Sequence, residues 1–232
     1  NDIDGEAVLD ESGWSVSLSS DGNTVAIGAY LNDGNGSNSG HVRIYHYNGA
    51  SWNQLGNDIN GEASGDYSGI SVSLSSDGSR VAIGAPLNDG NGTDAGHVRI
   101  YNYNGASWNQ LGNDIDGESV LDESGYSVSL SSDGNTVAIG AYLNDGNGTD
   151  AGHVRIYNYN GSSWDQLGSD IDGEASNNQS GRNVSLSSDG NTVAIGANAN
   201  NDNGSVSGHV RIYNWNGTSW TQLGQDIDGE AA

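Results

Sequence analysis

Acidic side chains gather in a short stretch that recurs along the chain. It reads Asp-Ile-Asp-Gly-Glu, with Asn60 replacing the second Asp in one copy, and its five copies start at Asp2, Asp58, Asp114, Asp170 and Asp226. Hard carboxylate oxygens at alternate positions, beside a glycine that permits a sharp bend, can converge on Ca²⁺ if the backbone curls. In an extended strand, the same acids share a solvent-facing side.

A second acidic stretch, Leu-Asn-Asp-Gly-Asn-Gly, starts at Leu31, Leu87 and Leu143, and its fourth version carries the acid one position later. It offers an acid, two amides and backbone carbonyls in one loop. Turns that merely face solvent are the alternative for both stretches, because Asp, Asn and Gly are common turn residues. The candidate Ca²⁺ ligands are Asp33, Asp89, Asp145, Asp202, Asp2, Asp4, Asp58, Asp114, Asp116, Asp170 and Asp172.

Histidine and arginine recur together in the motif His-Val-Arg-Ile-Tyr. A catalytic histidine normally occurs once, beside unique partners, whereas this one occurs in every repeat. We therefore predict a structural role, in which His and Arg share one strand face and pair with acids of the next repeat. These residues are His41, His97, His153 and His209, with Arg43, Arg99, Arg155 and Arg211.

The sequence offers no recognisable catalytic set. Every polar cluster repeats in nearly identical form, nothing pairs a nucleophile with a general base, and no phosphate-binding Gly motif follows a strand. We therefore expect that the chain is not an enzyme.

Asn-x-Ser/Thr sequons are frequent, and four of them fall in the same long loop of successive repeats. That loop could accommodate sugar, whereas chance occurrence in an Asn- and Ser-rich chain is the alternative. The candidate glycosylation sites are Asn35, Asn91, Asn147, Asn160, Asn203 and Asn216.

The composition is strongly acidic. Six basic residues, all arginine, stand against 30 acidic ones, which gives a net charge of −24 and a pI near 4.1. Such a charge repels phosphate backbones and anionic lipid, and no apolar run approaches the ~20 residues of a membrane helix. We therefore expect neither nucleic-acid partners nor membrane insertion.

Cysteine and an initiating methionine are both absent. The first absence excludes disulfides and thiolate chemistry. The second suggests a piece cut from a longer protein. An acidic, cysteine-free chain of this kind suits an extracellular, secreted or surface location.

Four repeats of 56 residues follow one another in register without an insertion. We place them at about 7–62, 63–118, 119–174 and 175–230, within one repeat domain spanning 1–232. There are five acidic segments but only four repeats. The extra copy favours the interpretation that the segment marks a boundary between repeats, ahead of the interpretation that it binds a cation.

Each repeat predicts four β-strands. In the first repeat these are Trp-Ser-Val-Ser-Leu-Ser from Trp14, Thr-Val-Ala-Ile-Gly-Ala from Thr24, His-Val-Arg-Ile-Tyr-His-Tyr from His41 and Ser-Trp-Asn-Gln-Leu-Gly from Ser51. An Asp-Gly turn at Asp21 joins the first two, and we expect type I′ geometry there. Helical periodicity is absent from the sequence.

Four antiparallel strands per unit are typical of a propeller blade, which buries its faces against neighbouring blades. One tryptophan per repeat is expected to pack between blades: Trp52, Trp108, Trp164 and Trp220. The predicted fold is an all-β propeller of four 56-residue blades. The blades could close a four-bladed ring or form part of a larger propeller or array.

The segment from Ser68 to Tyr101 resembles the FG-GAP repeat of integrin α-subunit propellers. Gly69, Ser71 and Val72 match the family's first element, Gly84-Ala85-Pro86 its Gly-Ala-Pro, and Gly96, Val98 and Tyr101 its last element. The resemblance covers all four repeats, although Pro86 is replaced by Tyr30, Tyr142 and Asn198 in the others. Integrin-type repeats also carry a calcium loop between the first two strands. Only one acid stands there in this chain, which falls short of calcium's 6–8 oxygen ligands.

The chain is also similar to bacterial and algal extracellular proteins with tandem repeats of this type. That resemblance implies a role in adhesion, matrix or fibre formation. The unpaired strand edges of an open stack would favour self-association between identical chains or neighbouring repeats. Glycans or a cell-surface protein are further candidate partners. The alternative is a lectin-like propeller that uses aromatic residues beside Asp/Asn loops. Its candidate aromatics are Tyr30, Tyr142, Tyr47, Tyr103 and Tyr159.

Overall fold

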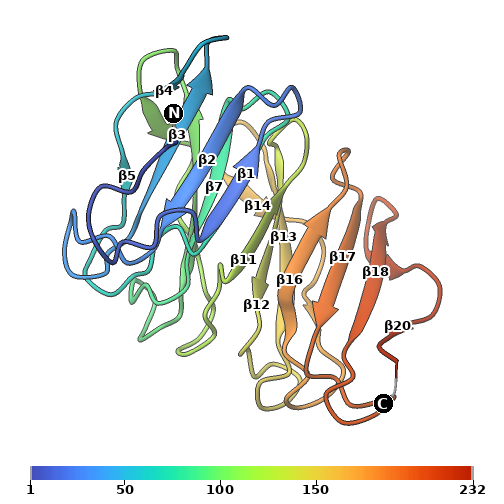
Figure 1. The fold of residues 1–232 in the computed structure, drawn as a ribbon. Coiled ribbons are helices and arrows are strands. Elements are labelled where there is room, and N and C mark those ends of the chain that lie inside the picture. The colour runs from blue at the N-terminus through green and yellow to red at the C-terminus, as the bar shows by residue number, and fades with distance from the viewer. Residues whose placement is uncertain (1, 231–232) are drawn as a thin grey trace.

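The protein is built of β-strands joined by turns. The computed structural model describes residues 2–230, and these contain twenty strands and no helix (Figure 1). The strands form four antiparallel sheets, one for each repeat. The all-β class predicted from the sequence is therefore confirmed.

Each sheet uses five successive strands. The innermost strands are β1 (Ser15–Leu18), β6 (Ser71–Leu74), β11 (Ser127–Leu130) and β16 (Ser180–Leu186). The second are β2 (Thr24–Ala29), β7 (Arg80–Ala85), β12 (Thr136–Ala141) and β17 (Thr192–Ala197). The third are β3 (His41–Tyr47), β8 (His97–Tyr103), β13 (His153–Tyr159) and β18 (His209–Trp215). The outer strands are β4 (Trp52–Gln54), β9 (Trp108–Gln110), β14 (Trp164–Gln166) and β19 (Trp220–Gln222), followed by β5 (Ile59–Asn60), β10 (Ile115–Asp116), β15 (Ile171–Asp172) and β20 (Ile227–Asp228).

The outer edge of each sheet consists of two short strands. In the first sheet, Gln54 of β4 pairs with Tyr45, and Ile59 of β5 pairs with Val42 farther along the same strand β3. The acidic segment thus forms the second half of the outer strand. Four strands per repeat were predicted, and this short fifth strand was missed because two residues give no periodic signal.

The turn between β1 and β2 differs from the predicted type I′ turn. Type I′ needs positive φ at both central residues, whereas here only Gly22 has one, at 72°. Gly22 N donates to the Ser19 carbonyl at 2.9 Å, and Asp21 Oδ1 accepts from Ser19 Oγ at 2.6 Å and from Asn23 N at 2.9 Å. These hydrogen bonds lower the pKa of Asp21 to about 2. The type I′ prediction is wrong because the Asp21 side chain holds a different, wider turn.

The hydrophobic cores lie between blades rather than within one. Val72 and Leu74 of β6, in the second blade, pack in one buried cluster with Val42 and Ile44 of the first blade. Equivalent clusters join the second blade to the third and the third to the fourth. Each internal blade therefore shares its hydrophobic core with its neighbours.

Glycine is required where blades approach closely. A Cβ at Gly84 would overlap the carbonyl oxygen of Gly125 on the next blade. Ser71 Oγ also donates to that oxygen, at 2.8 Å. The Gly-Ala element of the repeat thus sets the spacing between inner strands.

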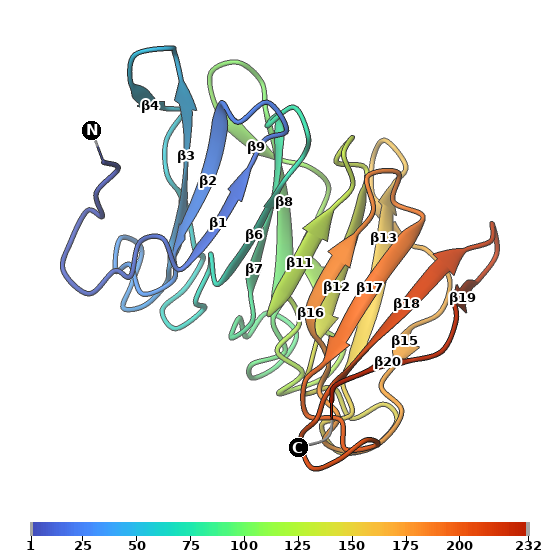
Figure 2. The ribbon, with the colours of Figure 1, turned by 45° about the vertical axis from the view of Figure 1, so that its right-hand side comes forward.

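The four blades follow one another along an open arc, with the first and last at opposite ends (Figures 1 and 2). Inner strands contact in chain order, β1 with β6, β6 with β11 and β11 with β16. At the first end Leu18 is 59% exposed, whereas its equivalent Leu74 is 7% exposed. The chain therefore adopts the predicted propeller fold with its two end faces uncovered.

Candidate functional site at the blade junctions

A buried histidine faces two carboxylates in each of the four blades. His97 begins β8, and its side chain is 1% exposed. Its Nδ1 lies 3.9 Å from Glu62 Oε2 and 3.8 Å from Asp114 Oδ2. Glu62 follows β5 of the preceding repeat, and Asp114 precedes β10, so the site joins two acidic segments to one blade.

Arginine and the strand ladder hold the two segments in place. Arg99 Nη2 donates to the Asn60 carbonyl at 2.8 Å, and its Nη1 lies 3.6 Å from Glu62 Oε1. Ile115 pairs with Val98, which fixes the second segment beside His97. The acid that faces Arg99 thus comes from the preceding repeat, not from the next one.

The arrangement recurs four times, with Nδ1 to carboxylate distances of 3.6–3.9 Å. We call these sets the junction triads; they are Glu6–His41–Asp58, Glu62–His97–Asp114, Glu118–His153–Asp170 and Glu174–His209–Asp226. Each of the three internal segments gives its first Asp to one triad and its Glu to the next, whereas the first segment gives only Glu6 and the last gives only Asp226. Five segments therefore serve four triads, which accounts for the surplus copy.

Burial determines the charge of the triad. It lowers the pKa of His97 to about 4, and the Arg99 charge acts in the same direction. Burial likewise raises the pKa of Glu62. At neutral pH an uncharged imidazole thus faces the carboxylates. Its Nε2 is buried without a hydrogen-bond partner among residues 2–230.

The third triad, Glu118–His153–Asp170, opens into an acidic hollow of about 580 Å³. It brings the two predicted acidic stretches together, because Asp145 of the loop lines it beside Asp170 and Asp172. Asp122, which was not singled out from the sequence, also lines it and accepts from Asn144 Nδ2 at 2.9 Å. Asp145 Oδ1 in turn accepts from the Asp150 amide at 2.8 Å.

The other loop acids also accept hydrogen bonds from residues of their own loops. Asp33 and Asp89 accept from the amides of Asn38 and Asp94 at 2.8 and 2.9 Å. Asp202 accepts from Asn200 at 3.0 Å. Calcium binding by these residues stays a prediction.

The sequon amides of the long loops hold the acidic segments. Asn91 Nδ2 and Asn147 Nδ2 donate to the Gly117 and Gly173 carbonyls, both at 2.7 Å. Asn35 and Asn203 make the same contact at 2.8 and 2.7 Å. Asn160 and Asn216 donate to serine hydroxyls in their own turns, at 2.8 and 3.1 Å. Glycosylation also stays a prediction.

The tryptophans on the outer strands reach the preceding blade. Trp108 Nε1 donates to the Leu55 carbonyl at 2.8 Å, and Trp164 and Trp220 make the equivalent hydrogen bond at 2.7 Å. Tyr103 packs against Trp108 with ring centroids 5.1 Å apart. Trp52, in the first blade, lies on the uncovered end face.

Residues that differ between blades line a hollow of about 340 Å³ among the four inner strands. Trp14, Ile70, Tyr126 and Arg182 occupy the same place in successive repeats. The Arg182 guanidinium lies 5.0 Å from the Tyr126 ring centroid. Sequence reasoning missed this set, although the differing residues at one repeat position were a visible signal.

Stacked four-stranded blades with inner strands around a shared hollow define a β-propeller repeat protein. The FG-GAP repeat family matches residues 3–45, 60–101 and 115–157. The chain belongs to that family, as its sequence resemblance predicted. The fourth blade has the same strand order although the match does not extend to it.

Solved structures share the fold at low sequence identity. A protein assigned as a 6-phosphogluconolactonase from Bacteroides uniformis is 13% identical, with a TM-score of 0.63 over 93% of this chain and 55% of its own. The periplasmic gluconolactonase of Pseudomonas aeruginosa is 17% identical, with a TM-score of 0.60 over 92% and 56%. Hydrazine synthase of Kuenenia stuttgartiensis is 13% identical, with a TM-score of 0.57 over 99% and 53%.

The chain thus spans about half the length of these structures. No curated protein matches the sequence. Across residues 2–230, the structure has no helix suited to crossing a membrane.

The expectation that the chain is not an enzyme is wrong. Proteins named as lactonases share this fold, so the fold does not exclude catalysis. The premise was also incomplete, because residues around the inner hollow differ from blade to blade. The likeness itself shows the fold alone.

Proposed function

We propose that the chain is an extracellular repeat protein for adhesion, matrix or fibre formation, which extends by docking its end faces on further blades of the same kind. One observation carries this: the two end faces are complementary halves of an interface that the chain itself makes three times. A second copy of the chain presents the matching half to each end.

The apolar halves match residue by residue. At internal junctions Leu55 packs against the next blade beside Trp108. At the last blade the equivalent Leu223 is 51% exposed. Docking of a second copy would bring Leu223 against Trp52 and cover Leu18.

The polar groups of the two end faces are complementary as well. Leu74 N donates to Ser17 Oγ of the preceding blade at 2.9 Å, and Leu130 and Leu186 repeat this hydrogen bond. Ser185 occupies the position of Ser17 in the last blade, and its hydroxyl would meet the amide of Leu18 in a second copy. These hydrogen bonds would fix the register of docking.

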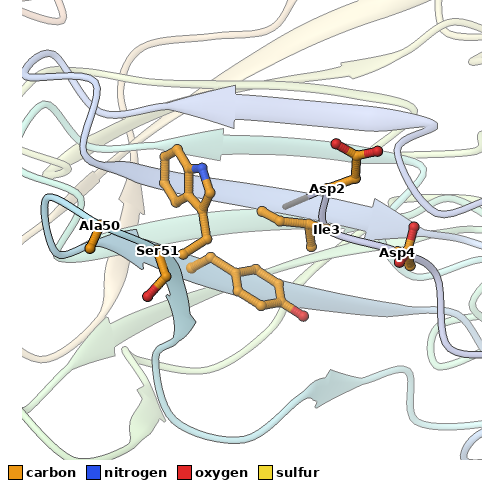
Figure 3. Close-up of a pocket in the computed structure, with 7 residues that line it drawn as sticks. Asp2, Ile3, Asp4, Ala50 and Ser51 are labelled. Atoms are coloured by element: carbon orange, nitrogen blue, oxygen red, sulfur yellow. The ribbon is translucent and has the colours of Figure 1, made fainter.

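The first acidic segment occupies part of the end face. Asp2, Ile3 and Asp4 lie on one side of a hollow of about 340 Å³, with Ala50 and Ser51 on the other (Figure 3). The Asp4 carbonyl accepts from Arg43 Nη2 at 2.7 Å, as the Asn60 carbonyl does from Arg99 at the next junction. The last segment of a docking copy would come to the same place, so one of the two segments must move away.

Sedimentation velocity over a range of protein concentrations tests this function. We expect concentration-dependent association that Leu18→Asp and Leu223→Asp each abolish. Asn109→Asp is the matched control, because Asn109 is exposed on the outer strand of an internal blade and Asp165 stands at the same place in the next blade. A chain that stays monomeric at all concentrations, or association that survives both substitutions, would contradict docking.

Carbohydrate binding is a second candidate function, favoured by the inner hollow. Trp14 is exposed there and packs on Tyr30 with ring centroids 4.8 Å apart. Exposed aromatic faces beside polar loops suit the apolar faces of sugars. A glycan array tests it: we expect hits that Trp14→Ala removes, and an array without hits would contradict it.

A further inference from the structure

We propose that each junction triad binds a divalent transition-metal ion of the zinc class, through His97 Nδ1, Glu62 Oε2, Asp114 Oδ2 and their counterparts. Such an ion would join two successive acidic segments to the blade between them. It differs from the calcium expected of the loops, because a histidine nitrogen is among its ligands.

The spacing of the three ligand atoms fits such an ion. In three of the four triads they all lie within 4.8 Å of one another, and at the fourth His209 forms such a group with Glu174 and Asp202 and another with Asp226 and Asp228. Zinc bonds to His and carboxylate are about 2.0–2.2 Å, so atoms at two corners of its tetrahedron lie about 3.3–3.6 Å apart. The measured separations of 3.8 and 3.9 Å at His97 exceed this by a few tenths of an ångström. The Glu62 and Asp114 side chains are 46% and 31% exposed and can make that approach.

The histidine is the observation that points to a ligand. Its side chain is almost completely buried, yet Nδ1 lies beyond hydrogen-bonding distance of both carboxylates. The equivalent Nδ1 of His209 is buried without a hydrogen-bond partner among residues 2–230, which costs free energy that a bond to a cation would offset. With the proton on Nε2, the Nδ1 lone pair points to the carboxylates.

The surrounding charges allow a cation. Arg99 approaches Oε1 of Glu62, whereas Oε2 faces His97, so the guanidinium and a metal would take different oxygens of one carboxylate. At the third triad Asp145 and Asp172 line the same hollow as Glu118 and Asp170. The chain as a whole carries a net charge of −24. This field favours entry of a divalent ion.

The ligand set selects the metal. Calcium and magnesium take oxygen ligands almost exclusively, whereas imidazole with carboxylates suits zinc and its neighbours. Three protein ligands leave a fourth position for water. Because the three ligands come from separate parts of the junction, binding would stabilise blade stacking by mass action.

Metal titration of the full chain tests this site. Chelator-treated protein, at a concentration where it sediments as a monomer, is titrated with zinc by calorimetry, with excess calcium present. Co²⁺ then replaces zinc to report tetrahedral coordination through its visible absorption. Because the protein is monomeric, the outcome is independent of the proposed docking.

We expect about four ions per chain, falling to about three in His97→Gln, and a higher melting temperature with zinc than with chelator. His46→Asn is the matched control, because Asn102 and Asn158 stand at the same place in other blades. Glu62→Gln, at a half-exposed side chain, provides a second variant should His97→Gln fail to fold. The site is overturned if zinc does not bind saturably, if calcium competes equally, or if Glu62→Gln and His97→Gln leave the stoichiometry at four.

Discussion

Leu74 and Leu18 occupy the same position in successive repeats but in opposite surroundings. Leu74→Ala removes a side chain packed between two blades, whereas Leu18→Ala alters one that is 59% exposed. Loss of about three carbon groups at about 0.8 kcal/mol each, plus the cavity left behind, gives about 3 kcal/mol for Leu74→Ala. Leu18→Ala should change the free energy of unfolding by less than about 0.5 kcal/mol.

Urea unfolding followed by tryptophan fluorescence measures both values, at a concentration where the chain is monomeric. Leu130→Ala is the matched control, because Leu130 is as buried as Leu74. The three variants should share one denaturant slope, so that midpoints compare stability directly. A cost for Leu18→Ala equal to that for Leu74→Ala would refute the open arc, since only a covered first face would produce it.

Three further outcomes follow from the junctions. The pKa of His97 is about 4 in the folded chain and about 6.5 in the unfolded chain, so between pH 4 and 6.5 the unfolded chain binds more protons. The urea midpoint, measured in chelator, should therefore fall as the pH drops from 6.5 to 4. An unchanged midpoint would contradict burial of a neutral imidazole. Trp108→Phe should cost about 1 kcal/mol of unfolding free energy, beyond any cost of Trp52→Phe, because only the former loses a hydrogen bond to the preceding blade. Gly84→Ala should abolish the cooperative thermal transition, because the added Cβ would overlap the next blade. Gly196→Ala should melt as wild type does, because Gly196 lies on the uncovered last blade and its nearest neighbours are 3.7 Å away. Equal melting temperatures of the two variants would exclude the overlap.

The strands and their order were predictable because each carries a local signal. Val72 and Leu74 alternate with serines, and the repeat places every strand four times in the same phase. The FG-GAP resemblance was equally visible in Gly84 and its neighbours. Local periodicity therefore sufficed for the fold class.

The junction triads depend on pairing between strands that are far apart in the sequence, and no local pattern predicts that pairing. Glu62 and Asp114 are 52 residues apart, and only the pairing of β5 and β10 with neighbouring strands brings both to His97. The type I′ turn was mispredicted for the opposite reason. Asp-Gly is a local signal, but the hydrogen bonds of Asp21 select another turn.

The inner hollow was not predicted, because the sequence patterns used were those that recur in every repeat. Trp14 and Arg182 share one repeat position, and their difference has meaning only once the blades stack around a common axis. Positions that break the repeat are therefore as informative as those that keep it.

Docking between end faces is tested most directly by mixing two variants. Leu18→Asp leaves the last face intact, and Leu223→Asp leaves the first face intact. Each variant alone should sediment as a monomer, and an equimolar mixture should form a heterodimer through the two intact faces. A mixture that stays monomeric, at a concentration where the wild-type chain associates, would contradict head-to-tail docking.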